Sequence, residues 1–173
     1  MNALDYKLRY RNKWSIAAVR EKVVYEWLKY YCSQLGLKCI PSGIGTLSDR
    51  YNPYTFNGTP EQKYDFIIVD ERGEILCYVD VTGYGGREPC FLSYKVMYAL
   101  ERGIANRVVL IHVNDSTGAI RWVTAQHLAD LMRKGKTSLK KLYKDEKNYI
   151  CTTCTNLSYL NSLPHFLAFL KKR

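Results

Sequence analysis

Two aspartates stand inside apolar segments of the chain, where folding alone would rarely place a charge. Asp80 lies in the middle of the strand-like segment 77–82, although aspartate is depleted in strands. Asp65 opens the apolar run 65–69, where it is either a functional group or a strand-end group that meets water. If the two segments pair as a hairpin, the carboxylates converge, and they repel each other unless a cation lies between them. Mg²⁺ prefers oxygen ligands and commonly binds substrate phosphates as well. The two aspartates therefore predict metal-assisted phosphodiester cleavage.

A glutamate on the first predicted helix is a third candidate. Apolar residues at helical spacing predict a helix over residues 14–35, ended by Gly36. Glu21 lies within about 60° of Val24 and Leu28 around the helix, and therefore on the apolar stripe. A core-facing glutamate is costly unless it is paired or bound to a metal ion. The alternative is a residue at the edge of the stripe, whose carboxylate reaches solvent or a basic neighbour.

Apolar periodicity and turn residues divide the rest of the chain into strands and helices. The predicted strands are 37–40, 64–70, 75–82, 106–113 and 119–123, and the predicted helices are 14–35, 90–102 and 125–134. The run 106–113 follows a helix and is apolar throughout, which predicts parallel pairing in a sheet covered on both faces. We therefore expect an α/β fold with an αβββαβ core, in which helices flank a mixed central sheet.

The composition predicts one basic globular domain. The 173 residues carry 26 Lys and Arg against 16 Asp and Glu, a formal net charge of +10. Such a charge indicates a polyanionic partner, most commonly nucleic acid, or alternatively serves only solubility. We expect a single domain over residues 1–173, with a core at about 14–134 and an extension at 135–173. The basic residues expected to contact nucleic acid are Lys7, Arg9, Arg11, Lys13, Arg87, Lys140, Lys141 and Lys144.

The cysteines and the apolar segments bear on the compartment. Cys151 and Cys154 have CxxC spacing, and we expect them to be structural, in a disulfide or a zinc clip that would need two further ligands. Residues 1–14 lack the apolar segment of a signal peptide. The longest uncharged stretch, 148–170, contains too many polar side chains for a bilayer core. We therefore expect no membrane association and a cytoplasmic protein, in the host cell if the source is viral.

The carboxylates and the order of the elements resemble the PD-(D/E)XK nuclease superfamily over about residues 14–113. That superfamily has a glutamate on an early helix, an aspartate at a strand start and a D/E-X-K motif on the next strand. Glu21, Asp65 and Asp80 match these positions. The size and charge are similar to those of archaeal Holliday-junction resolvases and small nucleases of archaeal viruses. The resemblance implies a restriction-endonuclease-like fold and a dimeric DNA endonuclease, specific for junctions or nicking, whose three carboxylates bind Mg²⁺ or Mn²⁺.

Two positions depart from the motif of that superfamily. Tyr64 replaces its proline, and Thr82 replaces its lysine, which normally orients the attacking water and stabilises negative charge. Some superfamily members supply this lysine from the following helix, so Lys95 is expected to take its catalytic place, unless it is an ordinary solvated lysine. The alternative functions are a non-catalytic DNA-binding protein on a degenerate nuclease fold, or a zinc-stabilised interaction protein built on Cys151 and Cys154.

Overall fold

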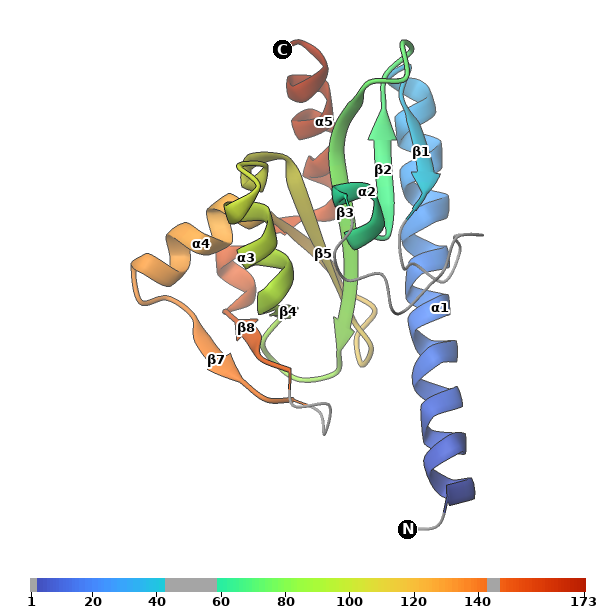
Figure 1. Cartoon of the computed structure of the whole chain (residues 1–173), viewed down its shortest axis with the longest axis vertical. Coiled ribbons are helices and arrows are strands. Elements are labelled where there is room, and N and C mark those ends of the chain that lie inside the picture. Colours follow the sequence, from blue (N-terminus) through green and yellow to red (C-terminus); the bar gives the residue numbers. More distant parts are fainter. Residues whose placement is uncertain (1–2, 43–58, 143–146) are drawn as a thin grey trace.

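The computed structural model describes residues 16–42, 59–142 and 147–173 with their side chains, and residues 3–15 as helical backbone (Figure 1). The helices are α1 (Ala3–Gln34), α2 (Pro60–Lys63), α3 (Ser93–Glu101), α4 (Ala125–Arg133) and α5 (Leu163–Lys171). The strands are β1 (Lys38–Pro41), β2 (Phe66–Val69), β3 (Ile75–Tyr84), β4 (Cys90–Leu92), β5 (Val108–Asn114), β6 (Ile120–Thr124), β7 (Ser138–Lys140), β8 (Tyr149–Cys151) and β9 (Ser158–Tyr159).

The main sheet has six strands in the order β1-β2-β3-β5-β6-β9. β3 and β5 pair in parallel, whereas the other neighbours are antiparallel. The crossover from β3 to β5 contains α3, as expected, because parallel neighbours need a long connection. The predicted mixed sheet, its β2–β3 hairpin and its parallel β3–β5 pair are therefore confirmed.

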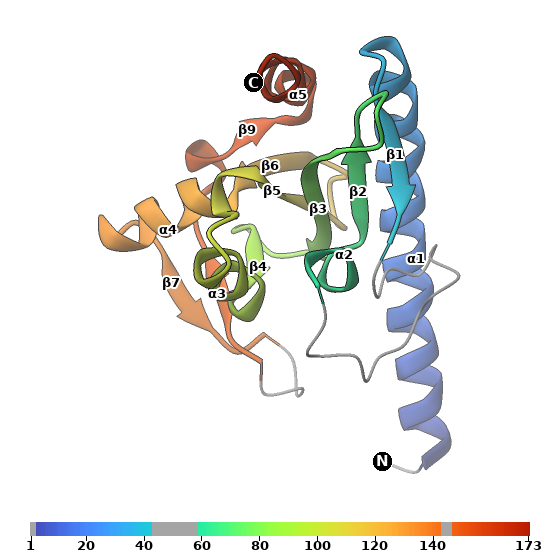
Figure 2. The same cartoon turned by 45° about the horizontal axis from the view of Figure 1, so that its top comes forward.

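Helices cover both faces of this sheet (Figures 1 and 2). On one face, α1 and α5 bury apolar side chains such as Leu28 and Leu167 against Val79 of β3. On the other face, α3 and α4 pack against Tyr78 and its neighbours. Successive side chains of a strand point to opposite faces. β3 therefore divides its residues between the two cores, and this alternation decides what each of its side chains can reach.

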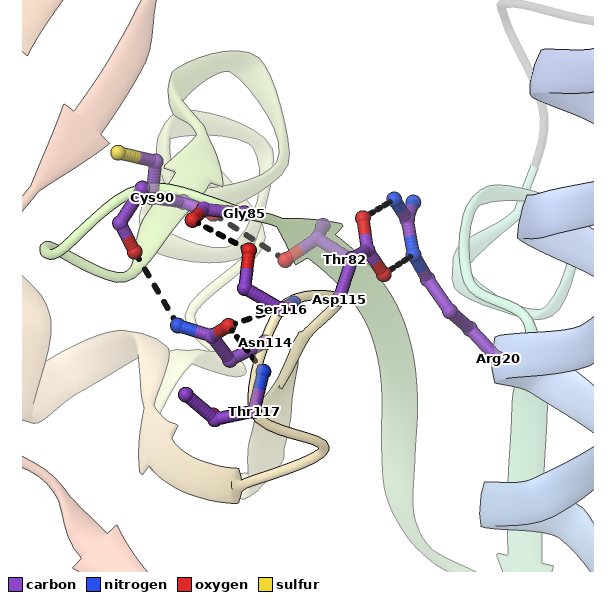
Figure 3. Close-up of polar contacts among 9 residues, drawn as sticks. Arg20, Thr82, Gly85, Cys90, Asn114, Asp115, Ser116 and Thr117 are labelled. Atoms are coloured by element: carbon purple, nitrogen blue, oxygen red, sulfur yellow. Dashed lines mark hydrogen bonds and ion pairs between the residues drawn. The ribbon is translucent and has the colours of Figure 1, made fainter.

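Helix α1 begins well before the predicted start at residue 14, and its N-terminal half extends past the sheet (Figure 1). Its packed half is anchored by Arg20, which forms a two-pronged ion pair with Asp115 in the β5–β6 turn (Figure 3). A Cβ atom at Gly83 would collide with the Arg20 guanidinium. Glycine near the end of β3 therefore leaves room for the Arg20 side chain on its way to Asp115.

The segment that follows β3 differs from its prediction. A helix was expected from residue 90, but Cys90–Leu92 forms strand β4, and α3 begins at Ser93. β4 pairs with β8 in a small three-stranded sheet of order β4-β8-β7. The prediction was wrong because the pairing partner lies far along the chain, where local periodicity carries no information about it.

The disulfide in the structure does not join the two cysteines of the CxxC motif, Cys151 and Cys154. Cys151 forms a disulfide with Cys90, at a sequence separation of 61 residues. Cys154 is a free thiol whose Sγ lies 3.8 Å from the carbonyl oxygen of Arg87. The two cysteines of the CxxC are therefore not bonded to each other. The bridge that does form ties β4, immediately before α3, to the C-terminal part of the chain.

The C-terminal residues contribute to both sheets and to the core. β7 and β8 belong to the small sheet, and β9 pairs with β6 at the edge of the main sheet. In α5, Leu163 and Leu167 are fully buried. Between β1 and β2, residues 43–58 lie outside the described part of the chain, and Pro60–Lys63 forms α2. Within the described part of the chain, none of the helices combines the length and the apolar character that crossing a bilayer requires.

Candidate active site

Asp65 and Asp80 converge on one face of the β2–β3 hairpin. The register pairs Phe66 with Val79, so that the preceding Asp65 lies opposite Asp80. Both side chains point towards α3, on the same face as Tyr78. The two residues are buried, with 5% and 2% of their surfaces exposed. The Asp65 carboxylate accepts a hydrogen bond of 2.8 Å from the Val81 backbone N–H, which fixes it beside β3.

Lys95 completes this buried cluster from the first turn of α3. Its ammonium group forms an ion pair with the Asp80 carboxylate, and only 4% of the residue is exposed. The interpretation of Lys95 as an ordinary solvated lysine is therefore wrong. Because α3 starts directly after β4, the tether of β4 to β8 also sets where this first turn lies. The structure thus brings together three of the four predicted catalytic residues.

The charges of the cluster are coupled. Burial raises the pKa of Asp80; the Lys95 ammonium opposes this rise and the Asp65 carboxylate adds to it, so that the pKa stays above its ordinary value. Burial by itself would lower the pKa of Lys95, but the Asp80 and Asp65 carboxylates outweigh it and raise that pKa. Lys95 therefore keeps its positive charge, paired with Asp80 and within the electrostatic influence of Asp65.

This donor set fits a hard divalent cation. Both carboxylates supply oxygen ligands, and their mutual repulsion is relieved by added positive charge. Mg²⁺ commonly uses one or two protein carboxylates and keeps several waters. Asp65 and Asp80 are the two side chains that would hold such an ion. Lys95 stands beside them as a fixed positive charge.

Two tyrosines that sequence reasoning did not assign to the site surround Lys95. The Lys95 Nζ atom lies 5.9 Å from the ring centre of Tyr64 and 6.0 Å from that of Tyr94. Burial raises the pKa of the Tyr94 hydroxyl above its ordinary value, Lys95 opposes the rise, and Asp80 and Asp65 add to it. Their positions in the sequence could have indicated this placement, because Tyr64 replaces the motif proline and Tyr94 directly precedes Lys95. Both rings lie within cation–π distance of the buried Lys95 ammonium.

Glu21 is placed differently from the other candidates. It is buried, with 7% exposed, but α1 covers the face of the sheet that carries Val79, opposite to the Asp80 face. Among residues 16–42, 59–142 and 147–173, no three His, Cys, Asp or Glu side chains gather closely enough to hold a metal ion. The expected cluster of three carboxylates is therefore not formed, because strand alternation directs Asp80 away from α1.

Three of the eight basic candidates have described side chains, and all three are exposed. Arg87 and Lys140 are exposed on neighbouring segments, since Lys140 forms a 3.1 Å ion pair with Glu88, the residue after Arg87. Lys141 is also exposed. The side chains of the remaining candidates lie outside the described residues; these are Lys7, Arg9, Arg11, Lys13 and Lys144.

Comparison with solved structures shows the same fold in a viral nuclease. D212, a nuclease from a fusellovirus, superposes with a TM-score of 0.65 at 22% identity, over 88% of this chain and 92% of its own. Hjc, a Holliday junction resolvase from the archaeal hyperthermophile Archaeoglobus fulgidus, matches with a TM-score of 0.42 at 12% identity, over 83% of this chain and 94% of its own.

Sequence comparison leads to the same group of proteins. The uncharacterized protein D-244 of Sulfolobus spindle-shape virus 1 is 28% identical over 123 residues, which are 63% of this chain and 50% of the relative. The chain thus spans about half the length of that curated relative. The sequence model of the viral/archaeal nuclease family matches residues 20–162, a range that includes the β2–β3 hairpin, α3 and the disulfide. On the strength of this match over most of its length, the chain belongs to the viral/archaeal nuclease family.

Proposed function

We propose that the chain is a metal-dependent DNA endonuclease of the PD-(D/E)XK type, which hydrolyses phosphodiester bonds. The observation that carries the proposal is the buried cluster of Asp65, Asp80 and Lys95 in a member of a nuclease family. Burying two carboxylates and an ammonium is costly for folding, so their presence points to a role other than stability. Groups with such strongly perturbed pKa values are typical of functional sites.

Each residue of the cluster has a distinct role in this proposal. Mg²⁺ or Mn²⁺, when bound, supplies Lewis acidity towards the scissile phosphate. Asp65 and Asp80 hold the ion, and the Val81 N–H keeps Asp65 aligned with Asp80. The Lys95 ammonium orients the attacking water and stabilises negative charge that develops on the phosphate. Glu21 is not needed as a direct ligand in this arrangement.

The substrate class follows from charge. The net charge of +10 and the exposed Arg87, Lys140 and Lys141 suit the phosphate backbone of DNA. We include a homodimer in the proposal, because two copies would place two cleavage sites on one substrate, as cutting of both strands of a junction requires. If the chain is viral, as D-244 and D212 are, the proposed site of its action is the cytoplasm of the host cell.

A cleavage assay tests the proposal directly. We expect the purified chain to cut linear duplex, single-stranded or four-way-junction DNA when Mg²⁺ or Mn²⁺ is present, and to leave all three intact in EDTA. Comparison of the three substrates identifies the DNA structure that is cut. Binding to DNA without cleavage under every metal condition would instead support a non-catalytic DNA-binding protein, in which Thr82 marks a lost activity.

The contribution of the basic segment to binding is measurable separately. Replacing Lys140, Lys141 and Lys144 with glutamine should flatten the dependence of DNA affinity on salt, because each lost phosphate contact removes about 0.9 from the log–log slope on duplex DNA. The replacement Lys29→Gln is the control, since Lys29 is exposed on α1 and pairs with Glu26. A triple variant with the same slope as the wild type would show that this segment is only solvated.

A further inference from the structure

Tyr64, which stands where the nuclease motif has proline, is bonded to the segment that carries Lys95. Its side chain is fully buried, and its hydroxyl donates a 2.9 Å hydrogen bond to the backbone carbonyl oxygen of Lys95. The next residue in the chain is Asp65. A proline at this position has no donor, so it could not make this bond. The segment just before β2, which carries one carboxylate, therefore holds the helical turn that carries the ammonium.

Thr82, which stands where the motif has lysine, is bonded to the same segment at its other end. Its hydroxyl donates a 3.2 Å hydrogen bond to the backbone carbonyl oxygen of Cys90 (Figure 3). Thr82 projects from the same face of β3 as Asp80, two residues before it. Cys90 begins β4, and the chain passes from β4 directly into α3.

The segment between these two anchor points is short. Residues 90–95 run from the carbonyl bonded by Thr82 to the carbonyl bonded by Tyr64. The disulfide of Cys90 with Cys151 and the pairing of β4 with β8 hold its beginning from the opposite side. Both hydrogen-bond donors lie close in sequence to a carboxylate of the cluster. Tyr64 directly precedes Asp65, and Thr82 follows Asp80 by two residues.

We infer that Tyr64 and Thr82 are positioning residues, which together compensate for the transfer of the catalytic lysine from β3 to α3. This inference rests on the proposed nuclease function and deepens it. A lysine on β3 is fixed by the same strand as Asp80, whereas a lysine on a separate helix depends on how that helix is tethered. Tyr64 in place of the proline and Thr82 in place of the lysine thus act together. Their hydroxyl groups hold the segment that places the Lys95 ammonium against Asp80.

The expected kinetic effect follows from the sensitivity of catalysis to position. A displacement of a reacting group by about 1 Å can lower the rate about 10²-fold. We expect removal of one of the two hydroxyl anchors to lower the single-turnover cleavage rate about 10-fold, because the other anchor remains. DNA affinity should not change, since both hydroxyls are bonded to backbone carbonyls within the protein.

The test compares variants that remove a hydroxyl with matched controls. Tyr64→Phe and Thr82→Val delete the two anchors, and Thr82→Ser keeps the donor. Tyr78→Phe is the control for Tyr64, because Tyr78 is a buried tyrosine of the same core cluster, 5.8 Å away between ring centres. The readouts are the single-turnover rate, the DNA dissociation constant and the NMR signal of the Lys95 side-chain ammonium, identified by its loss in Lys95→Met.

Tyr64→Phe and Thr82→Val should lower the rate and shift or broaden the ammonium signal, whereas Thr82→Ser and Tyr78→Phe should resemble the wild type. A general loss of stability would not produce this selective change in one side-chain signal. Unchanged rates together with an unchanged ammonium signal in both deletion variants would overturn the inference. If the wild-type chain cuts no DNA, the proposed function fails, and the ammonium signal alone then decides whether the two hydroxyls position Lys95.

Discussion

The Asp80→Asn variant should lose DNA cleavage almost completely, by on the order of 10³-fold or more, while it still binds DNA. Asparagine preserves the shape of the side chain but removes the charge that would bind the metal ion. Binding of the DNA is expected to persist or to strengthen, because one carboxylate fewer repels the phosphates. Cleavage is measured with Mg²⁺ under single-turnover conditions, and affinity is measured in EDTA.

Asp70→Asn is the control for that experiment. Asp70 lies in the turn between β2 and β3, where its carboxylate accepts hydrogen bonds from the backbone N–H groups of Arg72 and Glu74. It should therefore affect local stability but not cleavage. A second readout is thermal unfolding, since Mg²⁺ should stabilise the wild type by binding its folded state but not Asp80→Asn. Full cleavage by Asp80→Asn would remove the basis for placing the reaction at this cluster.

The Lys95→Ala variant should lower the cleavage rate about 10²-fold or more, because it removes the group that we propose orients the attacking water. It should also lower the free energy of unfolding by about 3–5 kcal/mol, because the buried Asp80 loses its ion-pair partner. A melting curve is therefore recorded first, and cleavage is measured where the variant remains folded. Lys63→Ala is the control, since Lys63 is a nearly buried lysine whose Nζ atom lies 5.3 Å from the ring centre of Tyr98.

Restoring the motif lysine distinguishes a catalytic role of Lys95 from a purely structural one. In the double variant Lys95→Ala/Thr82→Lys, the new ammonium extends from the same face of β3 as Asp80, where the PD-(D/E)XK motif has its lysine. We expect this variant to regain part of the lost rate. A double variant as inactive as Lys95→Ala, although folded and able to bind DNA, would contradict the view that the lysine has moved from β3 to α3.

The sequence by itself determined the local features of the site. The alternation within each strand and the tight turn between them place Asp65 and Asp80 on one face of a hairpin, and the structure shows that hairpin. The apolar run before Asn114 predicted the parallel neighbour of β3, and β5 is that neighbour. Thr124 caps α4 as its position suggests, by accepting a hydrogen bond from the His127 N–H. The hairpin and the helix cap depend on residues close together in the chain, and the parallel pair was indicated by the apolar run of β5 itself.

Only the tertiary structure decided which separate elements meet. Helical periodicity placed Glu21 on an apolar stripe, but the face of the sheet that α1 covers depends on how the whole helix packs. The pairing of β4 with β8 and the Cys90–Cys151 disulfide join residues separated by 61 positions. Lys95 reaches Asp80 because this pairing and the hydroxyls of Tyr64 and Thr82 hold the start of α3. Spacing along a chain specifies the face of one element, whereas contacts between elements arise from packing over long connections, which local pattern does not encode.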